Sequence, residues 1–130
     1  MAKRVKEFDM VQLYAALADA TRLRLLNLMQ GREVCVCYFV EILGQSQPKI
    51  SRHLAYLRRA GIVSARREGK WMHYKMEWPA DARAAAVLAA ALAGFRGDRA
   101  MQADVKRLGE ACCAPEKFVT LAGAPVPTVA

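Results

Sequence analysis

The four cysteines are the residues of this chain with the most distinctive chemistry. Cys35 and Cys37 are separated by one residue in the stretch REVCVCYFVEIL, and Cys112 and Cys113 are adjacent further along. Thiolate sulfur is a soft ligand that suits soft metals and metalloids. Side chains at positions i and i+2 point to nearly opposite sides of a helix but to the same side of an extended chain. Cys35 and Cys37 can therefore bind one atom only if the local chain departs from a regular helix.

Length and charge narrow the class of protein. The chain has 130 residues, which suits one domain, and its formal net charge is +8 at pH 7. Such a basic chain favours a polyanionic partner, with nucleic acid first. The N-terminal MAKRVKEFDM has no apolar signal segment, and the most apolar run, Ala84 to Phe95, is shorter than the roughly 20 residues that a bilayer requires. We expect a cytoplasmic protein with no membrane partner and with reduced thiols.

Hydrophobic periodicity predicts the elements that position these cysteines. Four helices are expected first, then a β-hairpin whose turn is REGK, and then two further helices. The expected ranges are helices at 8–17, 21–30, 34–43 and 46–59, the hairpin within 62–78, and helices at 80–93 and 99–111. This order, α-α-α-α-β-β-α-α, is mainly α with a hairpin wing, which is a winged helix-turn-helix. We expect one domain over residues 1–113 and a flexible C-terminal tail over 114–130.

The fourth expected helix, SQPKISRHLAYLRR, predicts contact with DNA. Ile50, Leu54 and Leu57 form one apolar stripe, and basic and polar side chains cover most of the remaining surface. A basic second helix followed by a basic hairpin is the layout of a DNA-reading module. Glutamine and arginine suit base edges, whereas serine and lysine suit phosphates. The candidate DNA-binding residues are Gln45, Ser46, Gln47, Lys49, Ser51, Arg52, His53, Arg66, Arg67 and Lys70.

Four motifs taken together resemble the arsenic-responsive repressors of the ArsR/SmtB family. They are DATRLRLL, CVC, SQPKISRHL and GKWMHY, and the resemblance covers roughly Leu13 to Met76. It implies a homodimeric winged-helix repressor that leaves its operator DNA when As(III) or Sb(III) binds cysteine thiolates, with no organic cofactor. The resemblance also implies a dimer interface formed by the N-terminal helix and the Ala80–Ala93 helix.

The ligand set departs from the family pattern. Well-known members of the arsenic branch have a third cysteine three residues after the CVC pair, and this chain has Val40 there. A site with three thiols must therefore take its third sulfur from Cys112 or Cys113. Three arrangements stay open: Cys35 and Cys37 with one late cysteine, Cys35 and Cys37 alone, or a separate site at Cys112 and Cys113. Sites with two thiols would suit methylated arsenicals, which have fewer free valences.

Other functions are weaker alternatives. The same fold could sense cadmium or lead, or could use its cysteines as a redox switch. Zinc is less favoured. The resemblance implies that zinc-sensing members of the family use histidine and carboxylate ligands on the helix corresponding to Ala80–Ala93, which has no histidine here, and no CxxC spacing occurs. A thiol enzyme that binds an oxyanion would need an arginine six residues after its cysteine. The residues at that spacing are Glu41, Leu43, Phe118 and Val119, so we expect no enzyme.

Overall fold

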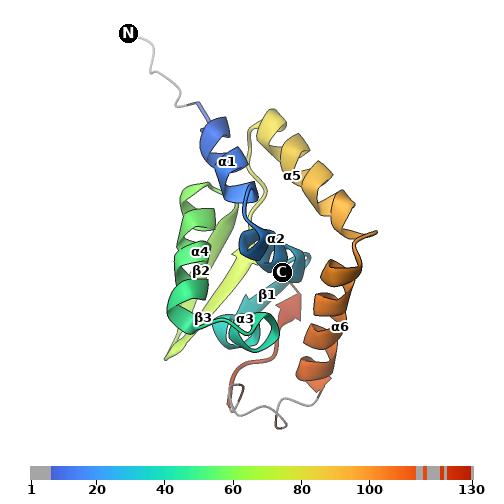
Figure 1. Ribbon diagram of the computed structural model, residues 1–130. Coiled ribbons are helices and arrows are strands. Elements are labelled where there is room, and N and C mark those ends of the chain that lie inside the picture. The colour runs from blue at the N-terminus through green and yellow to red at the C-terminus, as the bar shows by residue number, and fades with distance from the viewer. Residues whose placement is uncertain (1–6, 114–115, 117–120, 122, 130) are drawn as a thin grey trace.

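The computed structural model describes residues 7–113, 116, 121 and 123–129, which form a helical body around a small antiparallel sheet (Figure 1). The sheet order is β2-β3-β1-β4. The elements in chain order are α1 (Met10–Leu17), α2 (Ala20–Leu28), β1 (Arg32–Cys35), α3 (Val36–Leu43), α4 (Gln47–Arg59), β2 (Val63–Glu68), β3 (Trp71–Met76), α5 (Ala82–Phe95), α6 (Arg99–Cys113) and β4 (Thr128–Val129).

Aspartate side chains start several of the helices. Asp9, Asp19 and Asp81 each accept a hydrogen bond from a backbone N–H in the first turn of α1, α2 and α5. Asp98 accepts one from the N–H of Met101 in α6 at 3.1 Å. Such caps satisfy amide groups that have no partner within the helix. Asp19 thus caps α2 by accepting from the backbone N–H of Arg22.

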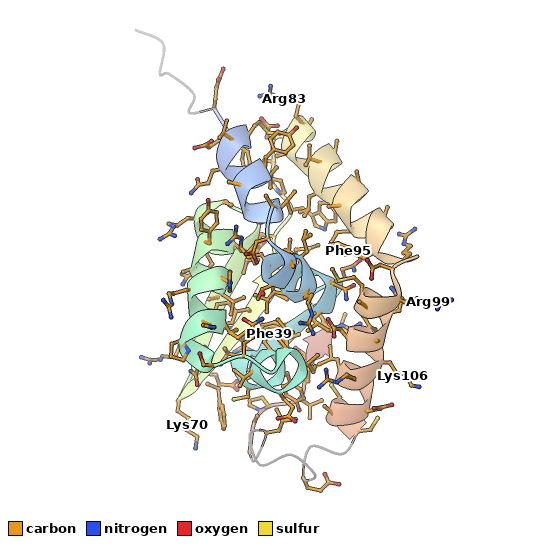
Figure 2. The ribbon with its side chains drawn as sticks, viewed as in Figure 1. Phe39, Lys70, Arg83, Phe95, Arg99 and Lys106 are labelled. Carbon is orange, nitrogen blue, oxygen red and sulfur yellow. The ribbon has the colours of Figure 1, made fainter. Side chains whose placement is uncertain are left out.

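The hydrophobic core is centred on α2 and α3. Leu25, Leu26 and Leu28 of α2 are fully buried, as are Tyr38 and Phe39 of α3. Figure 2 shows Phe39 in the interior, and it shows Lys70 at the hairpin tip and Arg99 and Lys106 on the outer side of α6. This burial anchors α3 between α4 and α6, which both pack against it. The winged-helix class is confirmed, with two short strands added to the predicted order.

The start of the third predicted helix is wrong. We expected a helix from Val34, but Arg32–Cys35 is the strand β1 and α3 begins at Val36. The cause is a long-range interaction, because β1 pairs with β3 in the register Val34 with Tyr74 and Cys35 with His73. Cys35 thus has extended backbone (φ −69°, ψ 142°) and occupies the N-cap position of α3.

Part of the C-terminal tail is packed on the domain. β4 pairs with the free edge of β1, with Val129 opposite Arg32 and Thr128 opposite Glu33. Leu121 is 1% exposed. Within the 114–130 segment, Thr128–Val129 thus forms an edge strand, because the unpaired edge of β1 offers backbone groups that an extended segment can bind.

Polar contacts hold α6 against α2 and α3. The Arg24 guanidinium donates to both carboxylate oxygens of Asp104, at 2.7 and 3.0 Å, and the Asn27 amide donates to the Met101 carbonyl at 2.8 Å. Arg107 donates to the carbonyl of Ile42 at 2.7 Å, near the end of α3. These contacts fix the direction of α6 and therefore the place where its last residues lie. Within the described residues, no helix combines the length and apolar character needed to cross a membrane.

The β4 pairing can be tested by deleting residues 128–130. Loss of its hydrogen bonds should speed amide hydrogen exchange within β1, because alternate amides of this strand face the edge that β4 covers. We expect only a small change in the free energy of unfolding, about 1 kcal/mol, since a net backbone hydrogen bond contributes about that much. Exchange mass spectrometry checks the first effect and thermal unfolding the second. Unchanged exchange throughout β1 would contradict the pairing.

Candidate thiol site and basic surface

Cys35 and Cys37 lie together where β1 passes into α3. Cys35 ends the strand and is fully buried, whereas Cys37 lies in the first turn of the helix and is partly exposed. The Cys37 thiol lies close enough to the Cys35 thiol to help raise its pKa. The strand-to-helix junction thus brings together two sulfurs that a continuous helix would separate.

Burial controls the protonation of Cys35. Desolvation raises the pKa of Cys35 to about 11, and the neighbouring Cys37 thiol raises it as well. The backbone N–H groups of Cys37 and Val36 oppose this rise. At neutral pH Cys35 is therefore a protonated thiol, which must lose its proton when it binds a soft cation.

The late cysteines are not equivalent. Cys112 is half-buried and packs against the hydrophobic core, whereas Cys113 is exposed. Burial raises the pKa of the Cys112 thiol, and the Arg32 guanidinium opposes the rise. Arg32 belongs to β1, so this interaction indicates that the end of α6 lies near the strand that carries Cys35. Of the two late cysteines, Cys112 is the one that faces the Cys35–Cys37 region.

The side chain of Tyr38 interacts electrostatically both with the Cys35–Cys37 pair and with Cys112. Burial raises the pKa of Tyr38, and charges at Cys112, Cys35 and Cys37 would raise it further. Cys113 is absent from these interactions. The described residues contain no ready-made group of three or more cysteine, histidine or carboxylate side chains for a metal ion. The structure therefore assembles two thiols and brings Cys112 to the same tyrosine without closing a three-sulfur site.

A basic face covers the outer side of α4. Gln47, Lys49 and Arg52 are exposed on this helix, Ser46 is exposed at its N-cap, and Ser51 is half-buried. Thr21, Gln45, Lys49, Arg52 and His53 line a shallow hollow at this face. The candidate residues of α4 are thus mostly free to contact a partner.

Two predicted contact residues already have partners within the protein. Gln45 donates a hydrogen bond to the Thr21 hydroxyl at 3.0 Å. His53 Nδ1 lies 3.3 Å from the Arg22 guanidinium and 3.7 Å from Asp19. Arg22 also stacks on Tyr56 at 4.2 Å and donates to the carbonyls of Ala15 and Ala16. Gln45 and His53 therefore help to fix α4 against α1 and α2.

The hairpin carries the remaining candidates. Arg66 is held by Glu33 of β1, with Nη2 at 2.6 Å and Nε at 2.9 Å from one carboxylate oxygen, so it fastens the hairpin to the sheet. This hydrogen bond lowers the pKa of Glu33. Arg67 and Lys70 are exposed near the tip, and Lys70 lies over the Trp71 ring at 4.9 Å.

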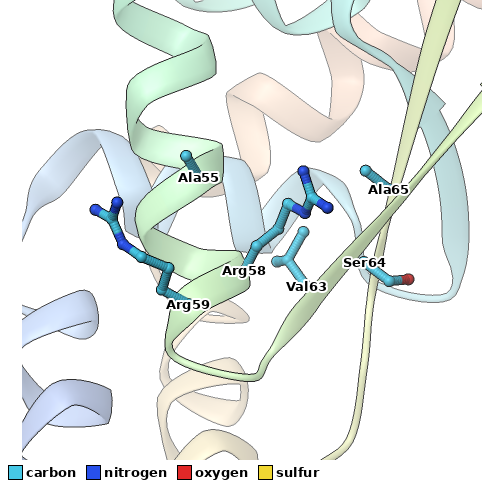
Figure 3. A pocket seen from close by; sticks show the side chains of 6 residues that line it. All are labelled: Ala55, Arg58, Arg59, Val63, Ser64 and Ala65. Atoms are coloured by element: carbon cyan, nitrogen blue, oxygen red, sulfur yellow. The ribbon is translucent and has the colours of Figure 1, made fainter.

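A second hollow lies between α4 and β2 of the hairpin (Figure 3). Its lining includes Arg58 and Arg59 of α4 and Ser64 and Ala65 of β2. In Figure 3, Arg58 extends toward β2, and Arg59 points to the other side of α4. Both arginines are exposed and absent from our list of candidate residues, although their position at the end of a basic helix was a signal for them. The roles of Arg22 and Tyr38 were also missed, because burial and partners do not show in the sequence.

Comparisons with known proteins agree with this fold. Residues 19–65 match the family model described as "Bacterial regulatory protein, arsR family". The chain is 51% identical over 67 residues to the "Arsenical resistance operon repressor" of Escherichia coli (strain K12), an alignment that covers 51% of this chain and 57% of that protein. The chain thus spans little more than half the length of that curated relative.

Two further proteins extend the comparison. The "Uncharacterized HTH-type transcriptional regulator MJ1325" of Methanocaldococcus jannaschii is 44% identical over 64 residues, with 48% of this chain and 72% of that protein covered. The crystal structure of the "AntR antimony-specific transcriptional repressor" superposes with a TM-score of 0.53 at 30% identity, covering 67% of this chain and 77% of that chain. All these names belong to transcriptional regulators rather than enzymes.

Thiol reactivity provides a test of the site geometry. We expect iodoacetamide to modify Cys113 fastest and Cys35 slowest, because Cys113 is exposed and Cys35 is buried with a pKa of about 11. A raised pKa lowers the thiolate fraction at neutral pH, so the rate at Cys35 should rise as the pH approaches that value. Mass spectrometry of timed samples gives the order. Modification of Cys35 before Cys113 at neutral pH would contradict the described burial.

Proposed function

Because the chain belongs to the ArsR family of bacterial regulatory proteins, we propose that it is a metalloid-responsive transcriptional repressor. It binds operator DNA and releases it when As(III) or Sb(III) binds cysteine sulfur. The observation that carries this proposal is the pairing of Cys35 and Cys37 at a junction that leads through α3 to α4. Such a protein acts in the cytoplasm, where its operator and its reduced thiols occur together.

The DNA-binding surface consists of α4 and the hairpin. Gln47, Lys49 and Arg52 reach the major groove, and Ser46 lies where the N-terminal amides of α4 meet a phosphate. Arg67 and Lys70 at the hairpin tip contact the neighbouring backbone. Arg66, bound to Glu33, and His53, bound to Arg22, contribute mainly by holding these elements in place.

The operator is bound by a dimer through α1 and α5. One side of α5 is buried at Ala84, Leu88 and Leu92, while its other side exposes small alanine residues that allow close approach of a second helix. Val11 and Tyr14 of α1 are also exposed, at 79% and 55%. Two large apolar side chains next to an alanine-rich helix face are what a helix-to-helix interface between two copies requires.

The inducer site consists of Cys35, Cys37 and Cys112. Trivalent arsenic is thiophilic, and As(OH)₃ exchanges three hydroxyl groups for three thiols with release of three water molecules. Cys35 and Cys37 supply two neighbouring sulfurs, and Cys112 faces the same Tyr38 side chain. Arg32 near Cys112 favours the thiolate form of that residue. Cys113, which is exposed, lies outside the site.

Binding at this site can reach both parts of the DNA-binding surface. Cys37 lies on α3, which packs against α4, and Cys35 lies on β1, which pairs with β3 of the hairpin. Since the described residues hold no closed three-sulfur site, Cys112 joins the pair only when the chain shifts, and in this proposal the first turn of α3 is the part that moves. A ligand that binds only the shifted state of the protein favours that state. The free energy of operator binding then changes by as much as the ligand's affinities for the shifted and unshifted states differ. A coupling of about 1–3 kcal/mol changes that affinity about 5- to 150-fold.

A soft-metal or redox sensor is the alternative with the same fold. Cadmium or lead would use the same thiols, and oxidation could join the adjacent Cys35 and Cys37 side chains. Release of DNA by peroxide, reversed by dithiothreitol and independent of arsenite, would favour the redox alternative.

Operator binding should depend on the exposed face of α4. We expect Arg52→Ala to weaken operator binding by about 1–3 kcal/mol, because Arg52 is exposed there and one good arginine contact is worth that much. Arg99→Ala is the matched control, since Arg99 is also exposed but lies on α6 (Figure 2). Fluorescence anisotropy with labelled promoter DNA gives both affinities. Equal losses in the two variants would contradict a specific role for α4.

The cysteines should control release and not DNA binding. We expect Cys35→Ser and Cys37→Ser each to bind operator DNA as the wild type does and to lose arsenite-induced release. Cys112→Ser should need more arsenite, whereas Cys113→Ser should respond as the wild type does, because only Cys112 faces Tyr38. Titration of arsenite into the reduced protein–DNA complex measures all four. Normal release from Cys35→Ser or Cys37→Ser would contradict the proposed function.

A further inference from the structure

The hydroxyl group of Tyr38 is buried without a hydrogen-bond partner. Tyr38 is 0% exposed, and within the described residues its oxygen is the one buried side-chain nitrogen or oxygen that lacks a partner. A buried polar atom without a partner destabilises a protein, and such atoms are uncommon in folded structures. A phenylalanine would fill the same space without this penalty. The hydroxyl is therefore unexplained by the fold of the ligand-free chain.

The charges that bear on this hydroxyl are those of the thiol site. Tyr38 follows Cys37 directly in α3, and its phenol interacts electrostatically with Cys112, Cys35 and Cys37. These are the three residues that the proposed inducer site uses. Cys113, which the proposal leaves out, does not contribute.

Thiols and metalloid-bound sulfurs differ as hydrogen-bond partners. A thiol keeps its proton and is both a weak donor and a weak acceptor, whereas a sulfur bound to a metalloid has lost that proton, keeps its lone pairs and can only accept. The phenol, which has no partner in the described structure, gains an acceptor when the neighbouring thiols exchange their protons for the metalloid.

We propose, on the basis of the proposed function, that the Tyr38 hydroxyl donates a hydrogen bond to a metalloid-bound sulfur, with Cys112 as the first candidate. Tyr38 is then a positioning residue rather than a ligand. Its hydroxyl is unsatisfied in the DNA-binding state and satisfied in the liganded state. This difference favours binding and helps to recruit Cys112, the sulfur that the described structure leaves outside the Cys35–Cys37 pair.

Tyr38→Phe tests the inference by removing one oxygen and keeping the ring. Arsenite is titrated into reduced wild-type and variant protein, and the near-ultraviolet absorption of the sulfur–arsenic bonds gives the dissociation constant. We expect about tenfold weaker binding in the variant, equivalent to about 1.4 kcal/mol. The Tm of the ligand-free variant should equal or exceed that of the wild type, because the variant lacks the unpaired hydroxyl. Tyr74→Phe is the matched control, since Tyr74 is also buried and its phenol interacts with Arg58 and Cys35 but not with Cys112, the proposed acceptor.

The outcomes separate this inference from the proposed function. Equal arsenite affinity of Tyr38→Phe and the wild type overturns the inference alone. So does a Tm that falls together with the affinity, because that result indicates a packing role. Failure of the wild type to show sulfur–arsenic absorption overturns the proposed function, and the inference with it. In a Cys112→Ser background, a much smaller effect of Tyr38→Phe supports Cys112 as the acceptor, and an undiminished effect overturns that assignment.

Discussion

The pairing of β1 with β3 is the interaction on which the rest of this structure depends. It keeps Arg32–Cys35 extended and ends the strand at Cys35, opposite His73. The helix can begin only after that point, so Cys35 and Cys37 occupy two different kinds of backbone and their sulfurs meet. If α3 began earlier, the same two residues would lie on opposite sides of one helix.

This junction also explains how a small site can affect a large surface. β1 is bonded to the hairpin on one side and to β4 on the other, and α3 is packed between α4 and α6. The thiols thus lie on two elements that contact both parts of the proposed DNA-binding surface. The same packing brings Cys112 toward Tyr38, because the Arg24–Asp104 and Arg107–Ile42 contacts fix α6. Stability and sensing thus share one set of contacts.

Sequence reasoning recovers what local chemistry determines. The apolar stripe of α4 and the turn of the hairpin both follow from residue types at short spacing, and the structure has both of them. Gly44 ends α3 with φ +65°, a conformation that glycine adopts readily. The strands β1 and β4 were missed because each is short and is stabilised by a partner distant in sequence.

The candidate site was predictable in part for the same reason. Spacing alone raised the question of how Cys35 and Cys37 could act together, and the family resemblance named the chemistry. Cys112 and Cys113 differ in burial, and the Tyr38 hydroxyl lacks a partner because of the residues that pack around it. Neither property can be read from the sequence. Arg66 and His53 were expected to face DNA, but the fold gives them partners in Glu33 and Arg22.

X-ray absorption at the arsenic edge tests the central claim most directly, because it counts the atoms bonded to the metalloid. The measurement compares one-to-one arsenite complexes of the reduced wild type, Cys112→Ser and Cys113→Ser. The account predicts three sulfur neighbours in the wild type and in Cys113→Ser, and two in Cys112→Ser. Two sulfur neighbours in all three proteins, or three in Cys112→Ser, would contradict a site formed by Cys35, Cys37 and Cys112.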